Sequence, residues 1–427
     1  MNKVALSEIA KYSSDRVSCS ELTVENYVST DNIRQNRAGK NRSQYVPTSG
    51  HTTAYKKGDI LVANIRPYLK KIWLATNDGG SSADVSTLRI SSDQFLPEFV
   101  YYNLFQDSFF DYAMQGAKGS KMPRIDKQHI MKFPIADFDI NSQVGITQTL
   151  GFIDQKICIN NKINAELEGM AKALYDYWFV QFDFQDENGK PYKTSGGKMV
   201  WSEELKREIP EDWEARSFES VLQKSKNGDW GTENYTNSDS QKIYCIRGAD
   251  INALNGQNGV LSPPVRYIEK SHKDRILAPD DLIIEISGGS PTQSTGRIAH
   301  IGDGVTTRFD APLVCSNFCK AITLHNKKLS YTVKHYWDRL YEAGIFFNFE
   351  GKTSGIKNLL FDQLTKDLFI PIPHEGTLVE EFHNVSSKFN DMAQNNLSEN
   401  QKLTEFRDWL LPMLMNGQVR VGKRIIH

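Results

Sequence analysis

The densest group of side chains with binding chemistry lies between Arg34 and Lys71. This stretch holds nine lysines and arginines against one acid, Asp59, so its net charge is +8. Lysine and arginine neutralise phosphates, whereas arginine, asparagine, glutamine and serine can also reach the edges of DNA bases. Because both kinds alternate here, we predict DNA contacts from Arg34, Arg37, Lys40, Arg42, Arg66, Tyr68, Lys70 and Lys71.

Two further groups extend this prediction. The segment from Gly116 to Arg124 is a flexible basic loop whose backbone amides can face phosphate. In the second half of the chain, the glycine- and serine-rich run 288–296 permits close approach to a DNA backbone. From these groups and their neighbours we predict contacts by Lys118, Lys121, Arg124, Arg247, Ser290, Thr292, Gln293, Ser294, Arg297, Lys352 and Lys357. For any one residue, the alternative is a solvated surface charge.

The sequence contains no recognisable motif for catalysis or metal binding. It lacks a Gly-x-x-x-x-Gly-Lys-Ser/Thr phosphate loop, and it lacks the Asn-Pro-Pro-aromatic or Asp-Pro-Pro-aromatic run of adenine methylases. Asp280 and Glu285 flank a predicted strand as nuclease carboxylates do, but Ser287 stands where such a site needs lysine. Cys315 and Cys319 are a lone pair without histidines at ligand spacing. We expect no catalytic residue, no metal and no cofactor on this chain.

Length and composition predict a folded protein of two domains. The chain has 427 residues, too many for one ordinary core, and 24% of them are charged. Five scattered cysteines, with no apolar stretch of signal-peptide or membrane length, favour a reducing cytoplasm. The net charge of −1 argues against a general nucleic-acid binder, so the distribution of charge carries the prediction.

Two apolar series share one rhythm. The first runs from Ile146 to Trp178 in alternating steps of four and three residues, and the second, from Leu378 to Leu410, repeats it 232 residues later. This spacing predicts two coiled-coil helices, each roughly 50 Å long at ~1.5 Å per residue. The alternative is an ordinary amphipathic helix packed on a globular core. The predicted seam contains Ile153, Ile157, Leu167, Leu174, Val385, Phe389, Leu403 and Phe406.

The segments before these helices are repeated more loosely. Residues 56–62 are similar to 278–284, where a polar turn precedes a buried strand, and residues 27–33 are similar to 245–251. Each half therefore predicts a mixed α/β (α+β) globule followed by a long helix. We expect globular domains over 1–140 and 213–374, a helix over 141–184, a linker over 185–212, and a C-terminal helix and tail over 375–427.

Four segments resemble the specificity subunit of bacterial Type I restriction-modification enzymes. Residues 153–157 and 160–184 are similar to the central helical region of that family, 209–213 to the start of its second recognition domain, and 400–419 to its C-terminal helical region. The resemblance covers nearly the whole chain. It implies two tandem target-recognition domains separated by an antiparallel two-helix coiled coil, with a pseudo-two-fold repeat. The first half departs from the pattern, because it begins directly at Val4 without the Pro-Glu-Asp-Trp start.

The resemblance also implies a function. Each domain would read one half of a bipartite double-stranded DNA target, and the helices would set the distance between the halves. Two DNA methylase subunits would dock and modify adenine with S-adenosylmethionine, and restriction subunits would add cleavage that needs ATP and Mg. This chain would be a non-catalytic subunit without a membrane partner. Recognition domains vary within such a family, so no individual DNA contact is carried over.

Two other functions stay open on the sequence. A self-sufficient nuclease or methyltransferase would need the motifs that are missing. A non-catalytic adaptor with two interaction domains on a coiled coil explains the repeat, but it does not explain the +8 stretch. Salt-dependent DNA affinity separates an adaptor from a DNA reader, because only phosphate contacts release counterions.

Overall fold

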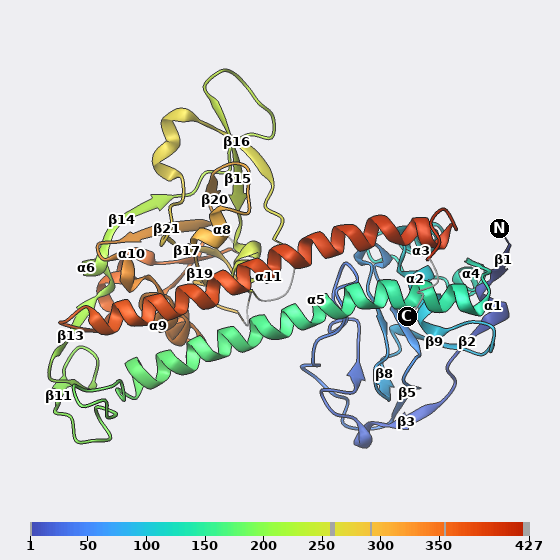
Figure 1. Cartoon of the computed structure of the whole chain (residues 1–427), viewed down its shortest axis with the longest axis horizontal. Helices are drawn as coiled ribbons and strands as arrows, with labels where there is room; N and C mark the ends of the chain where they lie inside the picture. Colours follow the sequence, from blue (N-terminus) through green and yellow to red (C-terminus); the bar gives the residue numbers. More distant parts are fainter. Residues whose placement is uncertain (1, 257–260, 291–292, 354–355, 422–427) are drawn as a thin grey trace, which may run out of the picture. The chain divides into compact units, whose positions relative to one another are not determined.

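The chain forms two compact units, each with its own hydrophobic core. The computed structural model describes residues 2–256, 261–290, 293–353 and 356–421, with the backbone alone at Lys352 and Thr353. Unit 1 comprises Met1–Ile157 and Lys402–His427, and unit 2 comprises Cys158–Gln401. The chain passes between the units twice, once within α5 (Ile140–Tyr175) and once within α11 (Thr377–Met415) (Figure 1). Among the described residues, no helix combines the length and apolar character needed to cross a membrane.

Unit 1 is built on a four-stranded antiparallel sheet with the order β2-β9-β6-β7. Its strands are β2 (Ala10–Tyr12), β6 (Ile60–Ala63), β7 (Ile72–Leu74) and β9 (Val85–Ile90). Strand β6 is buried throughout, and its side chains alternate between two cores, as a strand covered on both faces requires. Ile60 and Val62 pack in the core that includes Phe99 and Phe109 of α2 (Pro97–Phe105) and α3 (Asp107–Gln115).

The opposite face of this sheet packs on a second one. Leu61 shares a smaller core with Val28 and Tyr55. The second sheet has the order β3-β5-β8-β4, and only its β4–β8 pair is parallel. Its strands are β3 (Arg16–Ser18), β4 (Tyr27–Val28), β5 (His51–Tyr55) and β8 (Gly79–Ser81).

Unit 2 repeats this architecture. Its main sheet has the order β14-β21-β17-β19 and is also antiparallel throughout. The strands are β14 (Leu222–Asn227), β17 (Leu282–Glu285), β19 (Ile298–His300) and β21 (Cys319–Leu324). The two faces of β17 again enter separate cores, with Leu282 and Ile284 in one and Ile283 in the other. The larger core is closed by Trp337 of α9 (Ser330–Glu342).

The segments repeated in the sequence take the same places in both units. Strands β6 and β17 begin within the similar segments 56–62 and 278–284, and the turn before each strand is held by a buried aspartate. Asp59 accepts the amide of Lys56 at 2.8 Å, and Asp281 accepts the amide of Ala278 at 2.7 Å. The second sheet of unit 2, β16 (Val265–Glu269), β15 (Ser240–Ile246) and β20 (Leu313–Cys315), keeps a parallel β15–β20 pair that corresponds to β4–β8.

In each unit, a strand at the start of the globular domain also pairs with the strand that comes just before the long helix. In unit 1, β1 (Lys3–Ala5) pairs with β10 (Pro134–Ala136) and leads into the short helix α1 (Leu6–Ile9). In unit 2, β13 (Trp213–Ser217) pairs with β24 (Phe369–Pro373) and leads into α6 (Phe218–Val221). The predicted α/β fold class, with a repeated globule and two long helices, is confirmed.

Within each unit the two long helices run antiparallel. In unit 1, the Arg407 guanidinium donates to Asp154 at 2.7 Å, and Leu410 joins the core that holds Leu150. In unit 2, the Asn160 amide donates to Asn400 at 2.9 Å, and the Asn396 amide donates to Asn164 at 2.8 Å. Polar seam residues therefore pair with one another and fix the register of the two helices.

The predicted seam fits α5 better than α11. On α5, Ile153 and Leu167 are buried, and Ile157 and Leu174 are half-buried. On α11, Val385, Phe389 and Leu403 are only half-buried, and Phe406 is 49% exposed. Of the predicted series, α11 buries Phe382 and Leu410, and outside the series it buries Ser386, Leu397, Asn400 and Arg407. This is a correction to the predicted register, and its cause is that α11 covers the globular cores as well as pairing with α5.

The segment 185–212, expected as a linker, is partly built into unit 2. It contains a hairpin of β11 (Met199–Ser202) and β12 (Arg207–Pro210), and Ile209 is buried in the same core as Trp213. Arg207 holds the hairpin to the end of the long helix, because its guanidinium donates to the carbonyl of Val180 at 2.7 Å.

Candidate nucleic-acid interface

In unit 1, two loops join to form an exposed basic surface. The loop that follows β6 lies against the loop 116–125, because the Arg66 amide donates to the Pro123 carbonyl and the Ile125 amide donates to the Asn64 carbonyl, both at 2.8 Å. The loop 116–125 folds back on itself as a narrow ribbon, closed by the bridge between Lys118 and Arg124. A two-stranded ribbon is one of the shapes that the DNA major groove admits.

The side chains on this ribbon surface are suited to DNA. Arg66, Tyr68, Lys118, Lys121 and Arg124 are all exposed. Lys118 pairs with Asp126 at 3.1 Å, and Arg124 pairs with Asp84 at 2.8 Å. Such exposed pairs contribute about 0–1 kcal/mol, so DNA phosphates can compete with these carboxylates. We call these five exposed residues the ribbon surface of unit 1.

The other basic residues predicted in this half are held by the fold. Arg37 and Lys70 both donate to Asp107, at 2.8 and 2.6 Å, and Arg37 also donates to the Phe105 carbonyl. Arg42 pairs with Glu25, although it stays exposed. Because Glu25 and Asp107 lie outside the +8 stretch in sequence, reading the stretch alone overstates the free positive charge of this surface.

Lys40, Lys71 and Arg34 are less exposed than the ribbon surface. Lys40 donates to the Glu25 carbonyl at 2.7 Å and lies over the ring of Trp73, while Lys71 donates to the Thr30 carbonyl. Burial lowers the pKa of both lysines. Arg34 is half-buried. In this conformation these three side chains shape the loop beside the ribbon surface, and a DNA contact from them stays a prediction.

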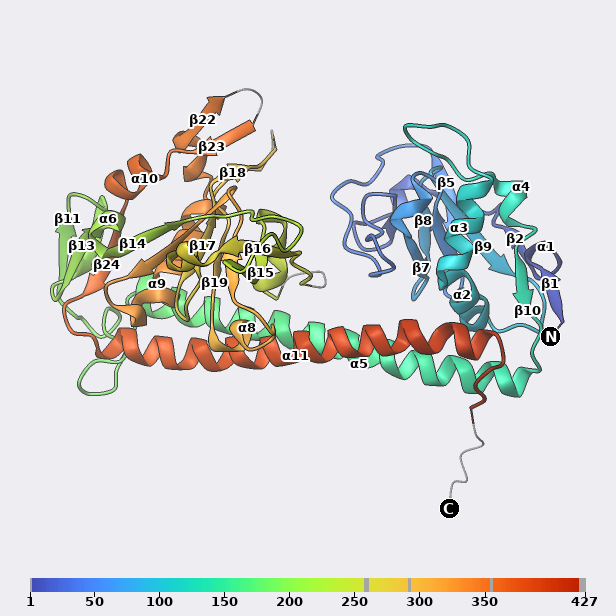
Figure 2. The ribbon, with the colours of Figure 1, turned by 90° about the horizontal axis from the view of Figure 1, so that it is seen from above.

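Unit 2 carries an equivalent loop and ribbon. Strand β18 (Ser287–Gly288) follows β17 and pairs with β23 (Ile356–Leu359), which in turn pairs with β22 (Glu350–Thr353) (Figure 2). The Leu359 amide donates to the Ile286 carbonyl at 2.8 Å, as the Ile125 amide does to Asn64 in unit 1. Ser287 pairs with Asn358 just as Ile65 pairs with Arg124. The fold therefore repeats this surface, although the two loops have little sequence in common.

The second-half residues predicted to contact DNA are placed less uniformly. Gln293 is exposed, Ser290 forms a bridge with it, and Lys357 pairs with Glu350 at 2.9 Å beside the β22–β23 ribbon. Arg247 is held by Asp250. Thr292 lies outside the described residues, as does the side chain of Lys352.

Two of these predictions need correction. Ser294 is buried and its hydroxyl donates to the Thr295 carbonyl. Arg297 makes a two-pronged pair with the buried Glu285, at 2.8 and 2.6 Å. Both side chains support the loop from within instead of facing solvent, so contact with DNA would require the loop to rearrange. Sequence reasoning could not find the pair of Arg297, because Glu285 becomes its neighbour only once β17 and β19 pair.

The two equivalent surfaces differ in chemistry. Unit 1 presents arginine and lysine, whereas the ribbon region of unit 2 exposes the apolar side chains of Phe347 and Ile356. Of the loop residues, Gly288 is half-buried and Gly289 is exposed, and a side chain at either would meet Glu285 or the Gln293 carbonyl. Similar scaffolds with different surface residues are suited to contact different sequences.

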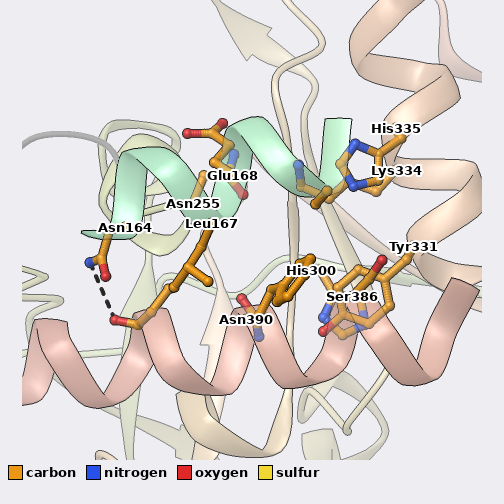
Figure 3. Close-up of a pocket in the computed structure, with 13 residues that line it drawn as sticks. Asn164, Leu167, Glu168, Asn255, His300, Tyr331, Lys334, His335, Ser386 and Asn390 are labelled. Atoms are coloured by element: carbon orange, nitrogen blue, oxygen red, sulfur yellow. Dashed lines mark hydrogen bonds between the residues drawn. The ribbon is translucent and has the colours of Figure 1, made fainter. Parts of the chain in front are cut away.

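A polar pocket in unit 2 lies where the long helices meet the globular domain (Figure 3). It is lined by Asn164 of α5 and Ser386 and Asn390 of α11, and by His300 and Tyr331 from the domain. His300 stacks on Tyr331 with ring centres 4.0 Å apart. The Asn164 amide also donates to the Ala393 carbonyl across the pocket.

Next to this pocket, one carboxylate joins the domain to α11. Asp280 accepts from His300 at 3.2 Å and from His383 of α11 at 3.0 Å. Burial raises the pKa of Asp280, but the hydrogen bonds from the two histidines outweigh this effect and hold it below its usual range. Burial lowers the pKa of His300. This cluster fastens the helix to the domain, and among the described residues no group of three or more His, Cys, Asp or Glu side chains could hold a metal ion.

Together, these features define a class of protein: two tandem α/β domains, each packed on a pair of antiparallel helices and each carrying a loop-and-ribbon surface. Comparison with known proteins narrows this class. The chain is 22% identical over 415 residues to the specificity subunit of the Type I restriction enzyme MjaIX from Methanocaldococcus jannaschii, which covers 94% of this chain and 86% of that protein. The resemblance to Type I specificity subunits is thereby confirmed.

Other comparisons agree with this result. The chain is 30% identical over 135 residues to the specificity subunit of the HindI enzyme from Haemophilus influenzae, which is 30% of this chain and 29% of that protein. The solved structure of a Type I S subunit from M. genitalium aligns with 97% of this chain and 95% of its own, with a TM-score of 0.53 and 16% identity, which shows a shared fold. No family model matches the chain.

Proposed function

We propose that the chain is the DNA-binding specificity subunit of a Type I restriction-modification enzyme, and that each unit reads one half of a bipartite double-stranded target. The observation that carries this proposal is the repeated surface: the same loop and ribbon occur in both units with different exposed side chains. Two related binding domains on one chain suit a split site with two half-sites. The similarity to specificity subunits over 94% of the chain supports the same function.

The exposed faces of the long helices support docking of partner subunits. In unit 2, α5 exposes Ile159, Ile163 and Met170, which lie on one side of the helix at heptad-like spacing. In unit 1, Phe406 and Trp409 of α11 are exposed and stack on each other. Apolar side chains gathered on a helix surface mark a protein contact. We assign these faces to two DNA methylase subunits, one for each unit.

The chemistry of the complex then belongs to its partners. The methylase subunits would supply S-adenosylmethionine and modify adenine, and restriction subunits would use ATP and Mg to cleave unmodified DNA. This chain would select the site and act in the bacterial cytoplasm without catalytic groups of its own. The nuclease or methyltransferase alternative has no support from the described residues, since their clustered carboxylates and histidines serve structural pairs.

The test is a map of methylated adenines in the host genome, with and without the gene for this chain. We expect one split motif to disappear on deletion and to return when the gene is restored. An unchanged methylation map, together with DNA affinity that does not depend on salt, would contradict the proposal and favour an adaptor, because an adaptor has no phosphate contacts that release counterions.

A further inference from the structure

Arg66 has a backbone conformation that is costly for any residue other than glycine. Its φ is 53°, in the left-handed region, where a side chain costs about 1–2 kcal/mol. The backbone is fixed there by several contacts: the Arg66 amide donates to Pro123 at 2.8 Å, its carbonyl accepts from Leu69 at 2.9 Å, and the buried Pro67 follows it. The conformation is therefore set by the surrounding loops.

The equivalent residue in unit 2 is a glycine. Ile65 corresponds to Ser287, because each pairs with the same position of its ribbon, so Arg66 corresponds to Gly288. Gly288 also has a positive φ, of 143°. This conformation differs from that of Arg66, and a side chain at Gly288 would also lie 2.9 Å from Glu285 Oε1. Unit 2 thus uses glycine at its positive-φ position, whereas unit 1 places an arginine in the left-handed region.

The arginine gains nothing in the free protein that would offset this cost. Its side chain is exposed, and within the part of the chain that the structure describes its guanidinium has no hydrogen-bond or ion-pair partner. Backbone strain of this kind persists at positions that serve ligand binding. The backbone therefore fixes the position from which the Arg66 side chain extends, next to the ribbon. All the N–H donors of its guanidinium are available to a ligand.

We infer that Arg66 reads a guanine in the half-site bound by unit 1, while Lys118, Lys121 and Arg124 hold the phosphates beside it. Arginine binds the O6 and N7 atoms of guanine with two parallel hydrogen bonds in the major groove, and a narrow ribbon fits that groove. Lys118 and Arg124 are exposed cations paired with the half-buried carboxylates of Asp126 and Asp84, and they can exchange those partners for phosphates. This inference rests on the proposed function and adds the residue that sets one letter of the target.

The experiment selects bound DNA from a random-sequence library with the full-length chain and reads the enriched motif. We expect the native chain to enrich a split motif that contains guanine in one half. Arg66→Gly removes the side chain and suits the left-handed backbone, so it should fold at least as well. It should lose discrimination at one base pair by roughly 5- to 150-fold, the range expected for one two-pronged contact, with all other letters unchanged.

Two further variants separate reading from charge. Arg66→Lys keeps the charge but cannot form two parallel hydrogen bonds with guanine. It should lose discrimination at the same base pair while retaining more of the affinity than Arg66→Gly does. Lys121→Ala should weaken binding to all sequences equally and lower the salt dependence by about one phosphate, with the motif intact. If Arg66→Gly enriches the native motif, or weakens every sequence equally, the inference is wrong. If the native chain enriches no motif, the proposed function fails as well.

Discussion

At the scale of single residues, charge in this protein is decided by neighbours that the sequence does not place side by side. Asp107 forms ion pairs with both Arg37 and Lys70, and Glu25 forms one with Arg42. The residues that stay exposed on the ribbon surface come from two segments more than forty residues apart, including Arg66 and Lys121. The basic stretch in the sequence therefore predicts a binding surface on unit 1. It does not show which lysines and arginines are held by carboxylates of the fold and which are exposed.

The same scale gives a prediction about pH. Burial lowers the pKa of His300 and holds that of His335 well below its usual value, so both rings are neutral in the folded protein. In the unfolded chain each would take up a proton near pH 6.5. Because the unfolded state then binds more protons, the free energy of unfolding of unit 2 should fall as the pH drops from 7 to 5, by at most about 1.4 kcal/mol per pH unit for each ring.

Urea unfolding at several pH values measures this slope. His300→Gln keeps an amide donor for Asp280 but cannot titrate, so the variant should show a shallower loss of stability between pH 7 and 5. The low pKa of Asp280 adds a further loss only under more acidic conditions, below about pH 4, where the unfolded carboxyl takes up its proton. A stability that stays constant from pH 7 to 5 in the native chain would contradict the buried neutral state of both rings.

At the scale of elements, the rhythm of apolar residues predicted α5 well and α11 less well. Helix α5 buries Ile146, Leu150 and Ile153 as the series requires. On α11 the buried face extends to Leu397 and Arg407, which lie outside the series, because this helix also closes two globular cores. A helix with two different neighbours has a wider buried face than one seam, and periodicity alone cannot assign its centre.

The paired asparagines of the helices give a prediction at this scale. The Asn396 amide donates to Asn164 at 2.8 Å. Asn164→Leu alone should destabilise unit 2 by about 1–3 kcal/mol, because it leaves a polar partner without its hydrogen bond. Replacing both residues by leucine should recover most of that loss or exceed it, as apolar replacement of buried polar pairs often does.

A double-mutant cycle of unfolding free energies checks this prediction. Asn395→Leu, at an exposed position of α11, controls for the change in helix propensity. Additive effects of the two seam substitutions would show that Asn164 and Asn396 do not act as a pair.

At the scale of the whole molecule, the repeat was the feature that the sequence predicted best. The equivalence of the two loop-and-ribbon surfaces was the feature that it predicted least. Residues 56–62 and 278–284 resemble each other because both must form a turn with a buried aspartate before a buried strand. The ribbons that follow share no such core constraint, so Arg66 and Gly288 could be matched only through the pairing of strands and bridges. Segments that pack in a core can therefore be matched from the sequence, whereas exposed surface residues are free to differ between the two units.

The proposed function makes a prediction for the molecule as a whole. Inserting seven residues into each long helix, after Ile157 and before Lys402, adds two helical turns to both crossings between the units. Each helix grows by about 10 Å, so the spacer between the half-sites should lengthen by roughly three base pairs while the half-site letters stay the same.

Methylation mapping of a strain with this chain would read the new spacer directly. An insertion in α5 alone serves as the control, because it breaks the antiparallel register and should abolish the motif. Altered half-site letters in the double insertion would contradict the assignment of reading to the globular domains.

The composition of unit 1 has a consequence for the order in which the protein is made. Its first part ends at Ile157, and its second part begins at Lys402, within α11, after the whole of unit 2 has been synthesised. At about 5–20 residues per second, a ribosome needs roughly 12 to 50 s to make the intervening segment. During this time the core around Leu150 lacks Leu410, Leu411 and Leu414. Unit 2 is therefore complete first, and the core of unit 1 closes only when the last part of α11 has been made.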